Sequence, residues 1–551
     1  MYKCRHIDYP ECSVYDFFEQ NAEKYPNEYA LNYFSKKISY KALVNEIDQC
    51  AKALKAMGVN RNDTVSICLP NIPQAVIAFY AINKIGAVAN MIHPLSAENE
   101  IKFYLSISES CLIIAIDLIW DKLKNVISDT KIQHTVLVSV KSYMPLTFKV
   151  GYWLKSGRKI KSPINILDWA KFMNYSKQYC GEVNAHGLKS DCAAILYSGG
   201  TTGKPKGIKL TNLNFNALAL QSIDASGCLK QGDKVLSVMP IFHGFGLGVC
   251  IHTALNIGGT AIILPKFSVA EFHKLLLKYK PNVIAGVPTI YEALLQNNEL
   301  DKKDLSFIKC VVSGGDSLSV STKKKLNKFL SEHGCTVSVR EGYGLTECVT
   351  GSCLMPDIHE KLNSVGLPYA DTYYKIANPK TKEEVPCGET GEIILRGPTV
   401  MDSYLKEPEE TKLALQIHED GNTWLHTGDL GYIDEDGYIY FKQRLKRMII
   451  SRGYNIYPQN IENIIDSHSS VLMCAVVGIA DKIKGQKVIA FVVLKDSVNS
   501  SDKLKSELYS LCEKNIARYS LPEDIKFINA LPKTLVGKIA YNELMKGYEN
   551  E

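Results

Sequence analysis

Residues 195–212, ILYSGGTTGKPKGIKLTN, combine glycines, hydroxyl side chains and lysines in a pattern suited to binding phosphate. Glycine lets the backbone take positive φ and approach a ligand closely, and successive N–H groups in such turns form concavities that bind anions. The hydroxyl groups would add donors, and the lysines would add positive charge. The candidate phosphate-binding residues are Ser198, Gly199, Gly200, Thr201, Thr202, Gly203 and Lys206.

Two familiar glycine loops do not fit this stretch. The phosphate loop G-x-x-x-x-G-K-[ST] needs a glycine where Ser198 stands and a hydroxyl where Pro205 stands. The dinucleotide fingerprint G-x-G-x-x-G also needs a glycine at Ser198, and Pro205 disfavours a helix that begins directly after Gly203. Because a surface loop rich in glycine, serine and threonine has the same composition, the rest of the chain must decide.

The loop resembles, residue for residue, the nucleotide signature of the adenylate-forming superfamily. This superfamily includes acyl-CoA synthetases, peptide-synthetase adenylation domains and luciferases. Further motifs of the superfamily follow in the expected order, and the resemblance spans most of the chain. They are PIFHGFGL from residue 240, SGGD from 313, EGYGLTE from 341, TGDLG from 427 and PKTLVGKI from 532. The first of these, P-x-F-H-x-x-G, is typical of acyl-CoA synthetases.

The resemblance implies a role for each motif in the first part of the chain. The backbone of Gly314, Gly315 and Asp316 would face adenine, and Tyr343, between Gly342 and Gly344, would stack on it. Thr346 would bind the α-phosphate, and Glu347 would bind Mg²⁺, which prefers one or two carboxylates together with phosphate oxygens. His243 would line the acyl pocket near the path of the thioester.

The motifs near the C-terminus imply ribose binding and a mobile lysine. A carboxylate such as Asp429 can accept hydrogen bonds from both ribose hydroxyls, and Arg444 would reach the ribose too. By similarity, Lys446 is the pivot between two domains, Gly453 and Tyr454 guide the pantetheine thiol, and Lys538 is the adenylation lysine. The chain departs from the family's hinge motif, since Gln443 replaces a glycine and Arg447 replaces an acidic residue.

The implied reaction joins a carboxylic acid to a thiol at the expense of ATP. The acid attacks the α-phosphate and pyrophosphate leaves, after which coenzyme A takes the acyl group as a thioester. Because both reactants of the first step are anions, catalysis would depend on positioning and charge neutralisation. The leading prediction is a fatty acid:CoA ligase that uses ATP, Mg²⁺ and CoA. Two alternatives remain open, an acyl-carrier protein as the acceptor and a non-catalytic nucleotide- or acyl-binding relative.

The periodicity of the chain predicts an α/β fold with two domains. Apolar strand-like runs alternate with helical stretches through the first two thirds, which favours parallel strands. From residue 389 onward, alternating apolar residues and Gly/Asp turns indicate β hairpins. We therefore expect a large domain over 1–444, made of α/β subdomains and a β-rich subdomain. A small mobile α+β domain over 445–551 would carry the adenylation lysine.

Composition limits the location and the partners. The net charge of +6 over 551 residues, with charges of both signs interspersed, argues against a nucleic-acid binder. The 16 cysteines are scattered singly and are typical of reduced core thiols. The N-terminus lacks the apolar core of a signal peptide, and no run is long enough to span a membrane, so we expect a cytoplasmic protein.

Two properties stay open at this level. Residues 143–162 mix aromatic and basic side chains, which suits either peripheral membrane contact or a solvated insertion. The chain length of the acid depends on how Phe245, Val249, Val287 and Tyr291 pack at the pocket. The oligomeric state also stays open.

Overall fold

The computed structural model of the chain describes residues 5–145, 166–198, 205–451, 454–481, 484–495, 498–516, 518–534 and 539–549. Most of the aromatic and basic stretch 143–162 lies outside these ranges. So do several predicted site residues, and of Lys446 and Tyr454 only the backbone is described. The predicted residues outside the described ranges are Gly199, Gly200, Thr201, Thr202, Gly203, Gly453 and Lys538.

The first large sheet carries the predicted phosphate loop at the end of one of its strands. Its strands follow the order β19-β9-β8-β4-β3-β5-β6-β7. β3, β4, β5, β6 and β8 pair in parallel, whereas β9 runs antiparallel to β8. The bounds are β3 Thr64–Cys68, β4 Val88–Met91, β5 Leu112–Ile116, β6 His134–Val138, β7 Leu167–Asp168, β8 Cys192–Ser198, β9 Lys206–Thr211 and β19 Ser403–Tyr404.

The second large sheet follows the order β16-β15-β14-β13-β12-β10-β11-β1-β2. Its central strands, from β14 to β11, pair in parallel, so their carboxyl ends lie along one edge. The bounds are β1 Tyr29–Tyr33, β2 Lys36–Ser39, β10 Lys234–Ser237, β11 Thr260–Ile263, β12 Val283–Gly286, β13 Cys310–Ser313, β14 Val339–Tyr343, β15 Cys353–Leu354 and β16 Leu367–Pro368.

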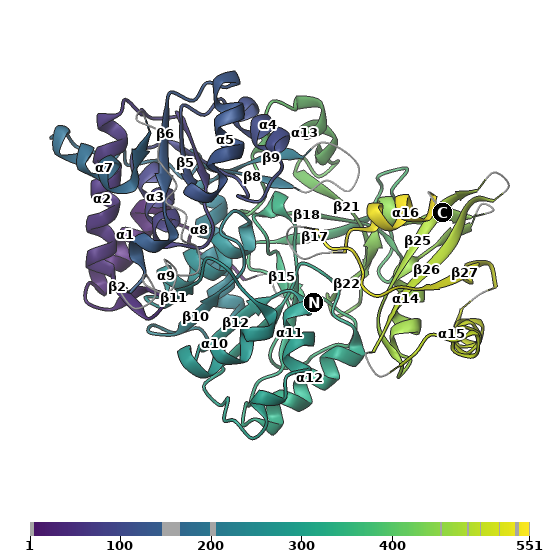
Figure 1. Ribbon diagram of the computed structural model, residues 1–551. Helices are drawn as coiled ribbons and strands as arrows, with labels where there is room; N and C mark the ends of the chain where they lie inside the picture. Colours follow the sequence, from purple (N-terminus) through teal and green to yellow (C-terminus); the bar gives the residue numbers. More distant parts are fainter. Residues whose placement is uncertain are drawn as a thin grey trace.

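Helices fill the space between the two sheets and cover their outer faces (Figure 1). Every residue of α3 is buried, and most of its side chains are apolar, as a helix buried on all sides requires. The bounds are α1 Val14–Lys24, α2 Tyr40–Ala56, α3 Pro73–Lys84, α4 Glu98–Ser108, α5 Trp120–Val126, α7 Trp169–Asn174, α8 Asn212–Ser226, α9 Ala254–Asn256, α10 Phe272–Tyr279, α11 Pro288–Leu295, α12 Val320–Glu332 and α13 Pro408–Ala414. A π-helix, η5, spans Phe245–Thr253 and leads directly into α9.

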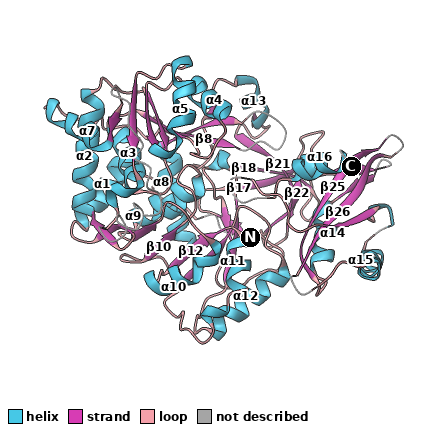
Figure 2. Ribbon diagram, in the orientation of Figure 1, coloured by secondary structure: helices cyan, strands magenta, loops and turns pink. Residues whose placement is uncertain are grey.

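The last third of the chain is rich in strands and contains two smaller sheets (Figure 2). One is built from β17 Tyr373–Ala377, β18 Gly391–Arg396, β20 Leu415–Ile417, β21 Thr423–Ile433 and β22 Ile439–Arg444. The other is built from β23 Ile449–Ser451, β24 Tyr454–Ile456, β25 Val471–Asp481, β26 Gly485–Leu494 and β27 Asp524–Phe527. The helices of this last unit are α14 Pro458–Asp466, α15 Asp502–Asn515 and α16 Tyr541–Glu549. Its buried side chains form clusters of their own on the two faces of β25 and β26.

The predicted α/β fold, with a large N-terminal and a smaller C-terminal domain, is confirmed. The apolar runs at 112–116 and 524–527 predict strands, and β5 and β27 have the same bounds. The hairpin of β1 and β2, helix α16 and the π-helix η5 were not predicted. Lys36 and Lys37 interrupt the alternation of apolar residues from which a strand is predicted. A π-helix as short as η5 shows no apolar periodicity from which it could be predicted.

The small C-terminal domain contains a group of buried acids on α14. Glu462 is 3% exposed and its Oε1 accepts hydrogen bonds from Val476 N (2.8 Å) and Arg447 Nη2 (2.7 Å). Burial, and then the charges of Glu462 and Glu292, raise the pKa of Asp466 from 3.8 to about 8. Asp466 Oδ1 is buried without a hydrogen-bond partner among the described residues. The folded chain therefore keeps a proton on Asp466 that the unfolded chain loses near pH 4.

We predict that the free energy of unfolding falls as pH rises from 3.8, the ordinary pKa of an aspartate, to about 8, the pKa of Asp466 in the folded chain. The folded state binds more protons than the unfolded state in this range, so the free energy of unfolding decreases with pH. Asp466→Asn should flatten the dependence of the thermal unfolding midpoint on pH between about pH 5 and 8. Glu513→Gln, at an exposed position of α15, is the matched control. A curve for Asp466→Asn that runs parallel to the wild-type curve would contradict the assignment.

Candidate functional site

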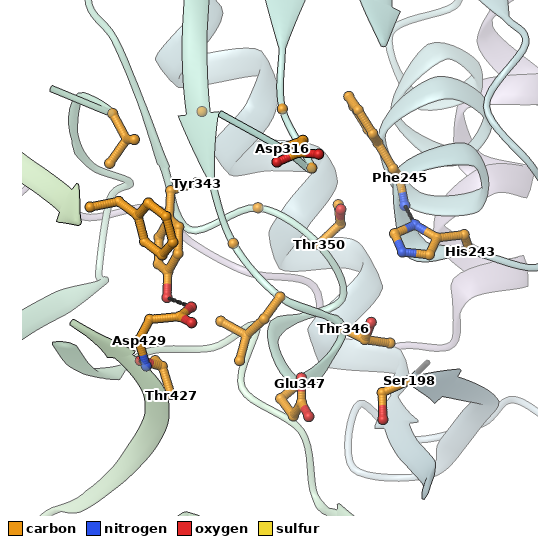
Figure 3. Close-up of a pocket in the computed structure, with 18 of the residues that line it drawn as sticks. Ser198, His243, Phe245, Asp316, Tyr343, Thr346, Glu347, Thr350, Thr427 and Asp429 are labelled. Carbon is orange, nitrogen blue, oxygen red and sulfur yellow. Dashed lines mark hydrogen bonds between the residues drawn. The ribbon is translucent and has the colours of Figure 1, made fainter. Parts of the chain in front are cut away.

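A cavity of about 1540 Å³ brings together most of the predicted site residues. It opens at the carboxyl ends of β13 and β14, and parts of β8, β9, β21 and the C-terminal segment complete its walls. Figure 3 draws 18 of the lining residues and labels ten of them. The predicted residues that line it are Ser198, Lys206, His243, Gly314, Gly315, Asp316, Gly342, Tyr343, Gly344, Thr346, Glu347, Asp429 and Arg444.

Strand pairing places two of the candidate phosphate-binding residues opposite each other. Ser198, the last residue of β8, pairs with Lys206, the first residue of β9. The Lys206 ammonium forms an ion pair with Glu410 of α13 and lies 4.6 Å from the centre of the Tyr404 ring. A positive charge therefore stands at the first residue of β9, which follows the glycine loop in the sequence, and Glu410 holds it there.

The predicted adenine-binding glycines lie side by side because β13 and β14 are parallel neighbours. Ser313 pairs with Glu341, so the segments that follow both strands leave the sheet at the same edge. Gly315 has φ +83°, a conformation that favours glycine. A Cβ on Gly344 would lie 1.8 Å from the Thr350 carbonyl oxygen, so this position excludes a side chain. This edge of the sheet therefore presents backbone to the cavity, as an open α/β sheet does where it binds a ligand.

Tyr343, Asp429 and Arg444 form one connected group. The Tyr343 hydroxyl donates to Asp429 Oδ2 over 2.6 Å, as Figure 3 shows, and Arg444 Nε lies 2.9 Å from Asp429 Oδ1. Asp429 is 1% exposed. Burial and then the Asp429 charge raise the pKa of Tyr343 well above its usual value, so the hydroxyl stays protonated and donates. The Tyr343 ring also stacks on Phe441, with ring centres 5.9 Å apart.

Glu347 is held by a tyrosine that sequence reasoning did not identify. Thr346 and Glu347 belong to the short 3-10 helix η8, Thr346–Cys348, and Tyr404 Oη donates to Glu347 Oε1 over 2.9 Å. The Met401 N–H donates to the Glu347 carbonyl over 2.8 Å. Burial and then the Glu347 charge raise the pKa of Tyr404, which keeps its hydroxyl protonated. Tyr404 reaches this place because β19 adds to the first sheet beside β9, a long-range pairing that no local pattern in the sequence indicates.

His243 lies where the chain enters the π-helix η5. Its Nδ1 accepts a hydrogen bond from the Phe245 N–H over 3.2 Å, which fixes the imidazole at the cavity wall. Phe245 and Val249 also line the cavity, as predicted. Val287 and Tyr291, which we expected beside them, are not lining residues. Tyr291 is fully buried in α11, and its hydroxyl donates to the Val312 carbonyl over 2.7 Å.

The C-terminal segment contributes to the same cavity on both sides of the undescribed residues 535–538. Lys533 and Thr534 line the cavity before them, and Ile539 and Tyr541 line it after them. Lys533 also pairs with Ile539 in an antiparallel bridge. Arg447, which departs from the family's hinge motif, makes an ion pair with Glu462 and lies 3.6 Å from the centre of the Tyr541 ring. Arg447 is thus tied to elements of the small domain.

Two other kinds of site are missing from the described part of the chain. Within it, no cluster of three or more His, Cys, Asp or Glu side chains could hold a metal ion. Cys348 and Cys353, which are both buried, are free thiols. No helix within the same residues is long and apolar enough to cross a membrane.

The chain matches two family models and has relatives over almost its whole length. Residues 18–405 match the AMP-binding enzyme model, and residues 460–538 match the AMP-binding enzyme C-terminal domain model. A long-chain-fatty-acid–CoA ligase of Bacillus subtilis is 33% identical, and the alignment covers 98% of this chain and 95% of that protein.

Two solved structures of one protein share the fold. The ATP-bound structure of MatB from Rhodopseudomonas palustris is 25% identical, with a TM-score of 0.83 over 97% of this chain and 99% of that one. The apo structure of the same protein covers the same shares at 25% identity, with a TM-score of 0.74. The sequence match, the fold and the residues gathered at the cavity lead to one assignment. The chain belongs to the AMP-binding enzyme family and is an AMP-forming acid–thiol ligase of the acyl-CoA ligase type.

Proposed function

We propose that the chain activates a fatty acid with ATP, forms the acyl-adenylate with release of pyrophosphate, and transfers the acyl group to CoA. The observation that carries the choice of a fatty acid is an apolar arm of the cavity. It starts at the edge of the sheet near Gly314 and runs along one face of the second sheet.

The register of the sheet explains how this arm forms. Val283 and Ala285 of β12 pair with Cys310 and Val312 of β13, and all four line the cavity. Alternate residues of a strand share a face, so these side chains make a continuous apolar floor. Val235 of β10 extends the floor beside Val283. From Gly314 back to Cys310 the floor is about 13 Å long at the usual rise per residue.

Helices form the roof of the same arm. The lining residues of α8, η5 and α9 recur one helical turn apart, and most are apolar or small: Ser222, Ser226, Val249, Thr253, Ala254 and Ile257. The whole cavity, at about 1540 Å³, exceeds the ~300–1,000 Å³ of ordinary small-molecule sites, which supports two substrates bound end to end. An aromatic acid would fill only the start of the arm. A chain of methylene groups would use its full depth.

We assign the nucleotide to the polar end of the cavity. The glycine edge of β13 and β14 would face adenine, with Tyr343 against its ring and Asp429 and Arg444 at the ribose. The glycine loop from Ser198 to Lys206 would bind the β- and γ-phosphates, and Thr346 would donate to the α-phosphate. Glu347 supplies a carboxylate beside the phosphates, which suits Mg²⁺ because this ion takes few protein ligands together with phosphate oxygens. Bound there, the ion would neutralise charge on the phosphates.

The small domain would serve the two half-reactions in turn. We propose that Lys538 enters the cavity for adenylation, because the residues on both sides of it line that cavity. The higher TM-score with the ATP-bound relative supports this arrangement. Rotation of residues 445–551 about Lys446 would then withdraw Lys538 and bring Gly453 and Tyr454 to guide the CoA thiol. Arg447 would move with the small domain, because Glu462 and Tyr541 hold it there.

A screen of acids tests the choice of substrate. Purified chain is incubated with ATP, Mg²⁺, CoA and single acids from acetate to oleate, with benzoate and 4-coumarate as aromatic controls, and the thioesters are measured by mass spectrometry. We expect the highest kcat/KM for medium or long chains, because each buried methylene adds binding free energy of about 0.8 kcal/mol. A preference for the aromatic acids would contradict the proposal. Repeating the assay with a carrier protein in place of CoA separates the alternative acceptor.

Tyr404→Phe tests the placement of Glu347. The variant keeps the ring under Lys206 but removes the hydroxyl that orients the carboxylate. A hydrogen bond to a charged group contributes about 1.5–3 kcal/mol, so kcat for adenylation should fall at least tenfold, with a higher Mg²⁺ concentration at half-maximal rate. The matched control is Tyr509→Phe at an exposed tyrosine of α15, which should leave both values unchanged. An unchanged Mg²⁺ dependence in Tyr404→Phe would contradict the role assigned to Glu347.

Two predictions from the sequence remain proposals. A cytoplasmic location fits a ligase that draws on ATP and CoA, and fractionation of cells would test it.

Membrane contact through residues 143–162 can be tested separately from catalysis. Replacing Phe148, Tyr152 and Trp153 by serine should lower co-sedimentation with liposomes if the contact exists, and equal sedimentation would exclude it.

A further inference from the structure

A buried carboxylate on β18 holds the turn that carries Asp429. Glu392 is 3% exposed and lines the cavity. Its Oε1 accepts a hydrogen bond from the Gly428 N–H over 3.1 Å, and its Oε2 lies 2.9 Å from His426 Nδ1 and 3.2 Å from Lys382 Nζ. Both carboxylate oxygens are therefore bonded to protein atoms, and one of them binds the backbone immediately before Asp429.

The turn is an irregularity in the pairing of β18 with β21. The register shifts between Glu392 and Ile394, so residues 427–429 of β21 stand opposite Ile393 alone. The extra residues of such a bulge lose hydrogen bonds of the ladder, and their side chains point in new directions. Glu392 gives the middle residue of the three an acceptor for its N–H. This bond fixes the backbone from which the last of the three, Asp429, extends its side chain.

A hydroxyl group stabilises the same turn. Thr427 Oγ1 donates to the Ile393 carbonyl over 2.6 Å and accepts from the Asp429 N–H over 3.1 Å. Figure 3 shows Thr427 next to Asp429 at the cavity. The Asp429 carboxylate is held by Tyr343 and Arg444, as described above. The backbone and the side chain of Asp429 thus depend on different partners, and Glu392 belongs to those of the backbone.

His426 sets the orientation of the Glu392 carboxylate. Its side chain is buried, and its Nδ1 donates to Glu392 Oε2. On the other side of the ring, His426 Nε2 lies 3.0 Å from His418 Nε2, and the neutral His426 ring accepts a hydrogen bond there. Burial favours the neutral acid, but the hydrogen bond from His426 and the charge of Lys382 outweigh it and lower the pKa of Glu392. Glu392 therefore stays ionised and accepts from all three donors.

We propose that Glu392 and His426 are positioning residues for nucleotide binding, because they fix the turn that presents the Asp429 carboxylate to the ribose. This inference rests on the proposed role of Asp429 as the ribose ligand. Glu392 acts through the Gly428 N–H, and His426 acts through Glu392. Loss of either side chain would let the turn relax, and the ribose hydroxyls would lose a correctly placed acceptor. The contacts to adenine and to the phosphates come from other segments and would persist.

Two nucleotides separate ribose binding from general damage to the site. Dissociation constants for ATP and for 2′,3′-dideoxy-ATP, which lacks both ribose hydroxyls, are measured by calorimetry. The wild type should prefer ATP by about tenfold or more, because the dideoxynucleotide cannot donate to a charged acceptor. In Glu392→Ala and in His426→Leu this preference should fall to about twofold, with little change in affinity for the dideoxynucleotide. His426→Asn, whose amide can donate to Glu392 in place of Nδ1, should restore the preference.

A control variant and the pattern of losses decide the outcome. Glu384 lies outside the cavity and pairs with Lys375 at 3.4 Å, so Glu384→Ala should keep the wild-type preference. An equal loss of affinity for both nucleotides in Glu392→Ala, or an unchanged preference for ATP, would overturn the inference. If Glu392→Ala does not fold, the comparison of His426→Leu with His426→Asn decides alone. A wild type that binds both nucleotides equally would instead refute the ribose role of Asp429 itself.

Discussion

Replacing Lys538 by alanine should lower acid-dependent exchange of pyrophosphate into ATP by about 100- to 1,000-fold, the usual effect of removing one donor to a developing charge. Transfer of supplied acyl-adenylate to CoA should continue near the wild-type rate. The first step brings a carboxylate against a phosphate, and both carry negative charge. A lysine between them stabilises the charge only while that step takes place.

The residues on both sides of Lys538 in the sequence support a role for this lysine in the first half-reaction alone. Lys533 and Thr534 on one side, and Ile539 and Tyr541 on the other, line the cavity that contains Asp429 and Glu347. Lys546→Ala, at an exposed lysine of α16, is the matched control and should leave both half-reactions unchanged. An equal loss in the two half-reactions of Lys538→Ala would show that the lysine serves general binding or stability. That result would refute the two-position arrangement of the small domain.

The second large effect is expected at Asp429. Asp429→Asn keeps the shape of the side chain but removes the charge that faces Arg444 Nε at 2.9 Å and accepts from Tyr343 Oη at 2.6 Å. The ribose hydroxyls would lose a charged acceptor, and a hydrogen bond to a charged group contributes about 1.5–3 kcal/mol. We therefore expect the dissociation constant for ATP, measured by calorimetry, to rise by at least about thirtyfold.

A control and a structural readout make this result specific. Asp434 lies outside the cavity and pairs with Lys361 at 2.6 Å. The control variant Asp434→Asn should therefore bind ATP like the wild type. The thermal unfolding midpoint of both variants must be measured, because Arg444 is left without its partner in Asp429→Asn. If Asp429→Asn unfolds at a lower temperature than the wild type but binds ATP with unchanged affinity, Asp429 supports the fold and is not the ribose ligand.

The motifs could be predicted from the sequence because each is local. The segments 313–316 and 341–347 each begin within the last residues of a strand, and parallel pairing of β13 with β14 brings them to one edge. Helix α1 begins after Ser13, whose side chain accepts from the Asp16 N–H, and this cap is visible in the sequence. Such features depend on a few consecutive residues.

Features that depend on pairing between distant segments could not be predicted in this way. Tyr404 reaches Glu347 only because β19 joins the first sheet beside β9. The floor of the apolar arm follows from the register of β12 against β13, which places Cys310 and Val312 at the cavity. A shift of one residue would turn the opposite set of side chains to the cavity.

The fate of the carboxylate oxygen tests the central claim most directly. Palmitate labelled with oxygen-18 in its carboxylate is incubated with ATP, Mg²⁺, CoA and the chain, and the products are analysed by mass spectrometry. Attack of the acid on the α-phosphate, followed by thioester formation, predicts AMP that carries one labelled oxygen and pyrophosphate that carries none. Label in inorganic phosphate with release of ADP, or no labelled AMP while palmitoyl-CoA accumulates, would contradict the account.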